Sequence, residues 1–372
     1  MRISRVESFI VRLGYKPIYQ RQTSKEGEFN AARSLSPTLD SLILRLETDT
    51  GLVGWGEAFG HACNPATFAL LTERLAPFLT GESCEDITVL MEKAHYAFHS
   101  YGRGGTMMYA LSALDIALWD LRGKAQNQPL WQLLGGTRSQ IELYPSLGSF
   151  DGDLDKLIPY VQNLMKQGYR HIKLHERDPE ATIAVSHAMP KGGVLMLDTN
   201  CAWCEEEAAA ILPRLREAGV AFVEEPTFPP EGLSCLQRLK QQTGMLLAAG
   251  ENMNNSEEFL QCISQGMVDV MQPSVAKIGG ISAVLDIIAA HRTNPNGTLL
   301  PHCFYYGPGL LATAHLLSVM PQTVPLEVPW LEFEQPLHPF MRWLPQLDLP
   351  RVPGLGFEPD PEVLARHTIA RG

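Results

Sequence analysis

Three apolar runs in the middle of the chain each end in a carboxylate. They occupy residues 194–198, 221–225 and 246–251, and amphipathic segments of helical length separate them. Each run follows the previous one by roughly one βα unit, about 30 residues. The pattern therefore predicts consecutive parallel strands that finish in acidic residues.

The same alternation of strand and helix patterns extends to both sides of these runs. Further strands are predicted at residues 141–146, 171–175, 268–273, 297–302 and 324–327. Eight such units over about 190 residues fit a TIM-type barrel, in which strands and helices follow one another in strict succession. We therefore assign residues 137–329 to an α/β barrel domain.

Before the barrel, the hydrophobic pattern is that of a small sheet followed by helices. Residues 3–13 and a hairpin over residues 41–57 alternate as strands, and residues 65–135 have the period of helices. Residues 107–123 are apolar on nearly all sides, which predicts a helix buried between two layers. We assign residues 1–136 to an α+β domain that caps the barrel.

Three segments lack a clear period. Residues 15–37 are polar and basic, and a long loop of this kind is either an active-site lid or disordered. We expect a lid, with a second lid loop at residues 54–64. Residues 330–372 are rich in Pro and Leu, and we expect them to pack back on the cap.

Composition and charge narrow the class of protein. The chain has 372 residues, of which 45% are hydrophobic and 19% charged, as in an ordinary folded protein with ample core. Its net charge of −11 argues against nucleic acid as a partner, because no basic stripe is available to neutralise phosphates. No signal peptide and no apolar run of about 20 residues is present, so we expect a cytoplasmic protein without membrane association.

The seven cysteines are scattered, which favours free thiols in a reducing compartment over a disulfide framework. Cys201 and Cys204 form a lone C-x-x-C pair. Because no second pair accompanies them, we do not interpret this motif as a zinc or redox element.

The three acid-terminated strands predict a metal site. Parallel strands bring their carboxyl ends to one face of a barrel, so Asp198, Glu224 and Glu251 should meet there. Any one of them alone could be a helix cap or a solvated strand end. Together, three carboxylates repel one another unless a cation binds, and oxygen ligands favour Mg²⁺ first and Mn²⁺ second. Zinc would require His or Cys.

With these motifs the chain resembles the enolase superfamily, in the mandelate racemase and muconate lactonizing enzyme group. The resemblance rests on residues 110–124, Asp198-Thr-Asn-Cys-Ala-Trp203, Val223-Glu-Glu-Pro226, Ala249-Gly-Glu-Asn252, Lys277-Ile-Gly-Gly280 and Leu300-Pro-His302. It implies a modified TIM (β/α)7β barrel with Mg²⁺ on Asp198, Glu224 and Glu251. It also implies a base that removes the proton α to a substrate carboxylate through a metal-stabilised enediolate, as is general for this superfamily.

The acid/base positions depart from the family pattern. The second strand often ends Lys-x-Lys in relatives, but here it ends Lys173-Leu174-His175. By the resemblance, Lys173 is the electrostatic helper. His175 is either the base or a hydrogen-bonding group for a substrate hydroxyl. His302 matches the histidine of the family's His–Asp dyad, yet Ser274 stands where the aspartate or a lysine would be, which leaves the imidazole tautomer less fixed.

Other residues receive roles from the resemblance or from their position. We expect His302 to be catalytic and Ser274 to face the substrate. Glu327 matches an eighth-strand acid that hydrogen-bonds the substrate carboxylate. We assign Asn200, Arg103 and Arg21 to substrate binding, and Glu225 to support of the metal ligands.

The leading hypothesis is a Mg²⁺-dependent lyase of carbohydrate catabolism that dehydrates a sugar acid, an aldonate or aldarate. A racemase or epimerase, or a sugar-lactone cycloisomerase, shares the first step and stays open. The competing class is a non-catalytic barrel that binds a metal or a small acid. We expect the partner to be a small hydroxy-carboxylate and the protein to be a homo-oligomer.

Overall fold

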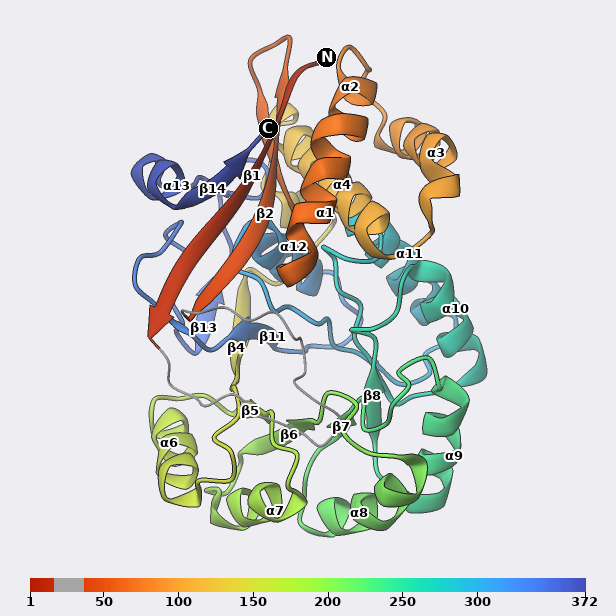
Figure 1. The fold of residues 1–372 in the computed structure, drawn as a ribbon, viewed down its shortest axis with the longest axis vertical. Helices are drawn as coiled ribbons and strands as arrows, with labels where there is room; N and C mark the ends of the chain where they lie inside the picture. Colours follow the sequence, from red (N-terminus) through yellow and green to blue (C-terminus); the bar gives the residue numbers. More distant parts are fainter. Residues whose placement is uncertain (17–36) are drawn as a thin grey trace.

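The computed structural model describes residues 1–16 and 37–372 of the chain. In these residues, an antiparallel sheet with helices stands over a curled parallel sheet that helices surround (Figure 1). This architecture confirms the predicted α/β fold class, a modified TIM barrel with an N-terminal α+β cap. Within the same residues, no helix combines the length and the apolar character needed to cross a membrane.

The barrel lies entirely in the described residues and contains eight parallel strands in the order β10-β9-β8-β7-β6-β5-β4-β11. The strands are β4 (Gln140–Ser146), β5 (His171–Leu174), β6 (Val194–Asp198), β7 (Val223–Glu224), β8 (Leu247–Ala249), β9 (Val270–Met271), β10 (Thr298–Leu299) and β11 (Leu326–Pro329). The connecting helices are α6 (Leu154–Lys166), α7 (Pro179–Ala188), α8 (Glu205–Glu217), α9 (Leu233–Thr243), α10 (Ser256–Gln265), α11 (Gly280–Thr293) and α12 (Pro308–Leu317). Every predicted barrel strand is present, and the succession is that of a (β/α)7β barrel.

The inside of the barrel is filled by one apolar layer. Its members are Tyr144, Met196, Phe222, Ala248, Val270 and Leu300, which come from six different strands or their ends. Because side chains alternate along a strand, the residue two positions later faces the same way. On each strand, the residue two positions after the layer residue therefore lines the carboxyl-terminal mouth of the barrel.

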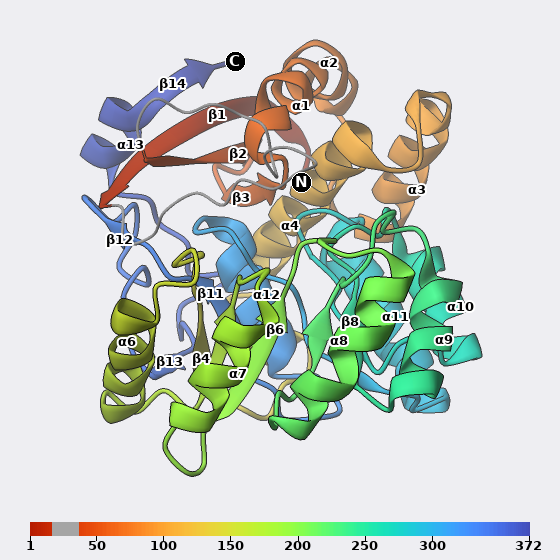
Figure 2. The same cartoon turned by 60° about the horizontal axis from the view of Figure 1, so that its bottom comes forward.

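The cap sheet is formed by β1 (Ile3–Lys16), β2 (Thr38–Thr48) and β3 (Val53–Ala58), paired antiparallel. Its helices are α1 (Asn64–Leu70), α2 (Ala76–Leu79), α3 (Ile87–Phe98), α4 (Gly105–Ala125) and the short α5 (Leu130–Leu133), with a π-helical turn at Leu71–Leu75. Helix α4 packs on β3 on one side and on α11 of the barrel on the other (Figure 2). The predicted buried helix is confirmed, since most residues of α4 are inaccessible.

Two glycines of β3 allow α4 to lie directly against the sheet. A β-carbon at Gly56 would come within 1.9 Å of the Ala113 carbonyl oxygen, and one at Gly54 within 2.4 Å of the Ala117 carbonyl oxygen. Both contacts are with helix backbone, which cannot rotate away. The close approach of β3 and α4 therefore requires glycine at these two positions.

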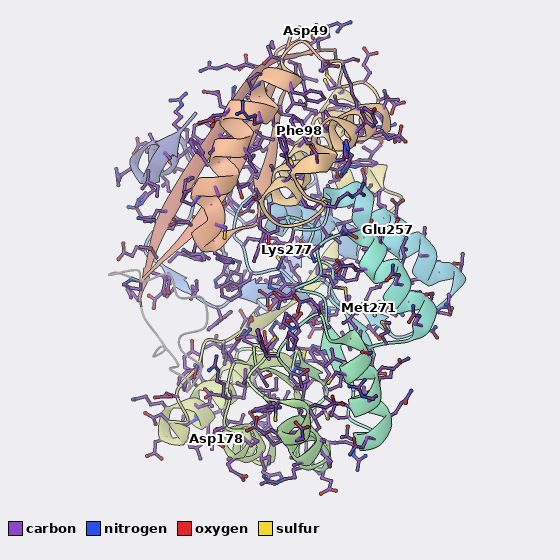
Figure 3. All side chains as sticks on the ribbon, turned by 45° about the vertical axis from the view of Figure 1, so that its right-hand side comes forward. Asp49, Phe98, Asp178, Glu257, Met271 and Lys277 are labelled. Atoms are coloured by element: carbon purple, nitrogen blue, oxygen red, sulfur yellow. The ribbon has the colours of Figure 1, made fainter. Side chains whose placement is uncertain are left out.

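Two buried acids of the cap bind the amino ends of barrel helices. Asp115 accepts hydrogen bonds from the Ser282 N–H (3.0 Å) and hydroxyl (2.5 Å) at the start of α11. Glu57 accepts one from the Gly309 N–H (2.9 Å) at the start of α12 and one from the Ser41 hydroxyl (2.5 Å). Neither helix has a side-chain cap of its own. These contacts fix the cap over the mouth of the barrel, and Figure 3 labels Lys277 in the region between the two.

The end of the chain contacts both domains. Strands β12 (Glu332–Phe333) and β14 (Thr368–Arg371) pair with β1 of the cap, and α13 (Pro361–His367) precedes β14. Strand β13 (Gln346–Asp348) pairs antiparallel with β4 of the barrel. The segment thus extends the cap sheet and also adds a short strand beside the start of β4 in the barrel sheet.

All seven cysteines lie in described residues, and all are free, as the sequence predicted. The Cys204 sulfur accepts the Glu207 N–H (3.5 Å) at the start of α8. The second cysteine of the C-x-x-C pair therefore caps a helix.

Replacing Gly56 with alanine tests the contact between β3 and α4. We expect Gly56→Ala to lower the free energy of unfolding by about 1–3 kcal/mol, because the added methyl group overpacks a rigid contact. The matched control is Gly232→Ala, where φ is −73° and the nearest atom to a β-carbon is 3.2 Å away. Urea unfolding measures both. Equal stability of the two variants would contradict this packing.

Candidate active site

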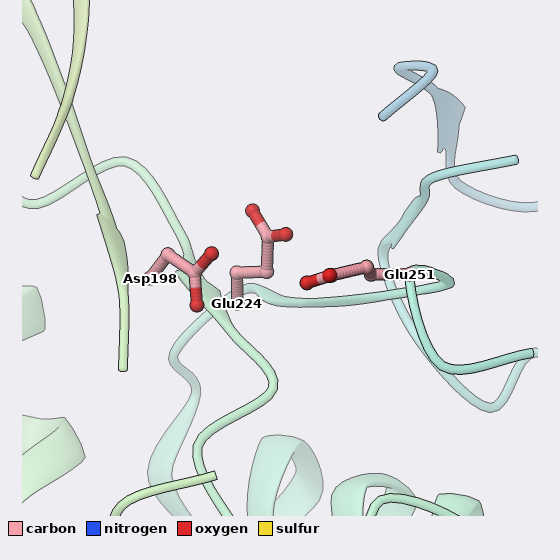
Figure 4. A group of neighbouring side chains, drawn as sticks. All are labelled: Asp198, Glu224 and Glu251. Atoms are coloured by element: carbon pink, nitrogen blue, oxygen red, sulfur yellow. The ribbon is translucent and has the colours of Figure 1, made fainter. Parts of the chain in front are cut away.

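Asp198, Glu224 and Glu251 meet at the mouth of the barrel, as predicted. Asp198 and Glu224 end β6 and β7 and are cross-strand neighbours, and Glu251 follows β8 by two residues. One carboxylate oxygen from each lies within 4.8 Å of the other two. Figure 4 shows Asp198 and Glu251 directed toward each other with Glu224 between them. We refer to these three residues as the acid triad.

The surroundings of Glu224 fit a cation. Its Oε2 accepts hydrogen bonds from Lys173 Nζ (2.9 Å) and Gln272 Nε2 (2.7 Å), but its buried Oε1 accepts none from any described residue. Burial, and then the Asp198 carboxylate, raise the pKa of Glu224 well above its usual value. A divalent ion would satisfy the free oxygen and offset the repulsion. Three oxygen donors of this kind are consistent with Mg²⁺.

Lys173 is buried among these acids. Its Nζ lies 2.6 Å from Glu327 Oε1, 2.9 Å from Glu224 Oε2 and 3.6 Å from Asp198 Oδ2. Burial by itself would lower the pKa of Lys173, but the carboxylates of Glu224 and Glu327 outweigh it and raise that pKa well above its usual value. The side chain is therefore a permanent positive charge beside the acid triad.

Glu327 lies at a gap in the barrel ladder. Strands β10 and β11 are not paired in the described residues, and the Cys303 N–H donates to Glu327 Oε2 across this gap (2.8 Å). Burial favours the neutral acid, but Lys173 and then His302 hold the pKa of Glu327 at about 2. An ionised Glu327 can only accept hydrogen bonds. Its predicted hydrogen bond to a substrate carboxylate would need a proton that this state lacks, so that role stays a prediction.

His175 stands at the Asp198 end of the acid triad. Its Nδ1 lies 2.5 Å from the Leu147 carbonyl oxygen, and its Nε2 lies 3.1 Å from Asp198 Oδ2. A carbonyl oxygen only accepts, so Nδ1 carries a proton and Nε2 is the atom that gains or loses one. Burial would lower the pKa of His175, but the Asp198 carboxylate raises it above its usual value.

His302 stands at the Glu251 end. Its Nε2 lies 4.0 Å from Glu251 Oε1, and the ring is buried. Burial lowers the pKa of His302, although the carboxylates of Glu251 and Glu327 oppose this. Two histidines with oppositely shifted pKa values thus flank the acid triad. Such a pair is suited to one proton acceptor and one proton donor.

Ser274 lies behind His302. Its hydroxyl oxygen is 3.3 Å from His302 Nδ1 and 3.4 Å from the Tyr305 hydroxyl, and the residue is completely buried. Its polar contacts are therefore with the histidine and Tyr305. The predicted contact of Ser274 with substrate stays a prediction.

Glu225 supports the turn that carries Glu251. Its Oε1 accepts the N–H groups of Gly250 (3.3 Å) and Asn252 (3.1 Å), and its Oε2 faces the Asn252 side-chain amide. Burial raises the pKa of Glu225 to about 7. Glu225 therefore holds the backbone turn that carries Glu251, and its predicted support of a metal ligand stays a prediction.

The predicted substrate-binding residues lie at different places. The Asn200 N–H donates to Asp198 Oδ1 (2.9 Å), so its backbone orients an acid of the triad. Arg103 lies in the cap loop before α4, where its carbonyl oxygen accepts from the Asn255 amide (3.1 Å) and its side chain is exposed. Contact of either side chain with substrate stays a prediction. Arg21 lies outside the described residues.

Of the two predicted lid loops, one can be placed. Residues 17–36 lie outside the described residues. In the second loop, the first residues belong to β3, and Phe59 and His61 follow it. The Phe59 ring lies edge-on to His302 (5.9 Å between ring centres) and to His61 (4.7 Å). This loop therefore contacts the candidate site.

Sequence reasoning missed Gln272 and Lys277. Lys277 Nζ donates to the Glu251 carbonyl oxygen and lies 4.8 Å from the centre of the Phe59 ring. Gln272 could have been found from the two-residue period of a strand, because several site residues follow a residue of the inner apolar layer by two positions. The pairs are Met196 and Asp198, Phe222 and Glu224, Val270 and Gln272, and Leu300 and His302.

The sequence and the fold match known proteins. The chain is 32% identical to D-galactonate dehydratase of Verminephrobacter eiseniae over 73% of each chain. It is 28% identical to D-galactarolactone cycloisomerase of Agrobacterium fabrum, over 88% of this chain and 91% of that protein. L-talarate dehydratase from Polaromonas sp. JS666, solved with Mg and L-glucarate, superposes with a TM-score of 0.86 at 25% identity and covers 100% of this chain and 98% of its own.

Both domains match family descriptions. Residues 22–135 match the mandelate racemase / muconate lactonizing enzyme N-terminal domain, and residues 157–363 match the enolase C-terminal domain-like family. The second match covers more than half of the chain. Together with the fold and the acid triad, these matches show that the chain belongs to the mandelate racemase and muconate lactonizing enzyme family of the enolase superfamily.

Proposed function

We propose that this protein is a Mg²⁺-dependent lyase that dehydrates a sugar acid, an aldonate or an aldarate. The observation that carries the proposal is the position of the acid triad between His175 and His302. A metal site flanked by two proton-transfer groups suits removal of the proton α to a carboxylate and departure of a hydroxyl group from the next carbon.

In this proposal Asp198, Glu224 and Glu251 hold the ion. Bound Mg²⁺ polarises the substrate carboxylate and stabilises the negative charge that develops there. One histidine accepts the α-proton, and the electron pair of the broken C–H bond forms a double bond to the β-carbon. The other histidine protonates the departing β-hydroxyl, which leaves as water. The enol product then becomes a 2-keto acid.

The buried charge of Lys173 completes this scheme. Its ammonium lies beside two acids of the triad and beside Glu327. It holds these carboxylates at fixed positions before substrate arrives, and such preorganised charge needs little rearrangement during the reaction. The named relatives, which act on D-galactonate and L-talarate, support a sugar acid as the substrate class.

A second candidate is a sugar-lactone cycloisomerase. It is favoured by the likeness to D-galactarolactone cycloisomerase, which extends over most of both chains. The first step is the same, but the ring oxygen of a lactone departs in place of a hydroxyl. The product then has the mass of the substrate, whereas a dehydratase product lacks one water.

Proton exchange with solvent tests the proposed function. The protein with Mg²⁺ in D₂O is incubated with a library of aldonates, aldarates and their lactones, and NMR and mass spectrometry follow each compound. We expect one class of sugar acid to give a 2-keto acid with loss of water. A ring-opened isomer of a lactone would select the cycloisomerase. Binding of acids without exchange or product from any compound would contradict both.

Removing one acid of the triad tests the ion site. At Mg²⁺ near 100 times its dissociation constant, binding should stabilise the native protein by about 2.7 kcal/mol. We expect Glu251→Gln to lose most of this Mg²⁺-dependent gain, measured as a shift in melting temperature. Glu217→Gln, at an exposed glutamate of α8, is the control and should keep it. A full Mg²⁺-dependent gain in Glu251→Gln would place the ion elsewhere.

Substitution of His302 tests the proton transfers. We expect His302→Asn to lower kcat by about 10²–10⁴-fold, the usual contribution of a general acid or base. His187→Asn, at an exposed histidine of α7, should have wild-type kcat. Steady-state kinetics on the substrate found above gives both values. Full turnover in His302→Asn would remove this residue from the mechanism.

A further inference from the structure

A line of buried hydroxyl groups runs behind His302. The Ser274 hydroxyl oxygen lies 3.3 Å from His302 Nδ1 and 3.4 Å from the Tyr305 hydroxyl. The Tyr305 hydroxyl lies 3.2 Å from the His302 carbonyl oxygen and 3.3 Å from the Thr313 hydroxyl. Ser274, His302, Tyr305 and Thr313 are all buried. In the family pattern an aspartate or a lysine would stand at position 274, and Ser274 carries neither charge.

Two backbone carbonyl groups determine which hydroxyl groups donate and which accept in these hydrogen bonds. The Thr313 hydroxyl lies 2.8 Å from the Gly309 carbonyl oxygen, which can only accept, so Thr313 donates there. For the same reason Tyr305 donates its single proton to the His302 carbonyl oxygen. The contact between Ser274 and Tyr305 must then use the Ser274 proton. The Ser274 oxygen is left as an acceptor, and the proton it accepts is on His302 Nδ1.

We propose that Ser274 and Tyr305 are positioning residues that hold neutral His302 with its proton on Nδ1 and a lone pair on Nε2. If the proposed function holds, this tautomer makes His302 the histidine that removes the α-proton. That consequence rests on the proposed function. Its Nε2 is the ring nitrogen toward Glu251, at the mouth of the barrel. The free nitrogen of His175, in contrast, faces Asp198 at 3.1 Å and is occupied by an acid of the triad.

The hydroxyl line differs from a carboxylate in its effect on charge. An aspartate would fix the same tautomer and also stabilise the imidazolium ion. Ser274 favours the same tautomer through its contact with Nδ1, without adding a charge. The Phe59 ring packs edge-on against the His302 ring, with 5.9 Å between the ring centres.

The tautomer can be measured directly on the resting protein. Full-length protein with ¹⁵N-labelled histidine and Mg²⁺ is studied by NMR at neutral pH, and His302→Asn identifies the His302 signals. We expect a protonated Nδ1 and an unprotonated Nε2. A proton on Nε2, or on both nitrogens, would overturn the proposal.

Two isosteric substitutions distinguish a role of these hydroxyl groups in hydrogen bonding to His302 from a role in packing alone. In Tyr305→Phe the Ser274 proton loses its acceptor and can turn to His302 Nδ1. We expect a shift toward the Nε2–H tautomer and a fall in kcat of about 10–100-fold, with a smaller change in KM. In Thr313→Val, Tyr305 keeps the His302 carbonyl oxygen as acceptor, and we expect the wild-type tautomer and kcat.

Melting temperatures show whether each variant is folded. Should Tyr305→Phe be too unstable, Ser274→Ala removes the acceptor of the Nδ1 proton and should weaken the same preference. An unchanged tautomer in a folded Tyr305→Phe or Ser274→Ala protein would overturn the proposal. The NMR measurement needs no substrate, so its failure is distinct from that of the proposed function, which the exchange assay in D₂O reports.

Discussion

The burial of three carboxylates around one ammonium group is the constraint on which this site depends. Asp198, Glu224 and Glu327 contact Lys173, and Glu251 completes the acid triad beside them. A single positive charge cannot balance so many buried negative ones, and unpaired charge in a protein interior is strongly destabilising. A divalent cation on the triad supplies the missing charge. Electrostatics and family membership are thus both consistent with an ion at the triad.

The rest of the fold keeps this charge cluster in place. The inner apolar layer of the barrel orients the strand ends, and the cap closes over them through Asp115 and Glu57, which bind the amino ends of α11 and α12. Those two helices follow the strands that carry Gln272 and His302. The cap therefore fixes the side of the mouth where His302 lies, and its loop residue Phe59 packs on His302 itself.

Patterns along the chain were sufficient to predict the barrel, the acid triad and the buried helix of the cap. These features follow from local periodicity and from the rule that parallel strands end at one face. Contacts between distant elements were not predictable in this way. Ser274 meets Tyr305, and Tyr305 meets Thr313, through tertiary packing, and β13 pairs with a strand some 200 residues earlier. Gln272 could have been predicted from the sequence, because it follows an inward-facing strand residue by two positions, as Asp198 and Glu224 do.

Anomalous diffraction from crystals grown with Mn²⁺ would test the central claim most directly. The account predicts one strong peak bound by an oxygen of each acid in the triad, including Glu224 Oε1, with Lys173 still paired to Glu327. Crystals that bind Mn²⁺ away from the triad would contradict it. So would a triad that stays free of ion at saturating Mn²⁺.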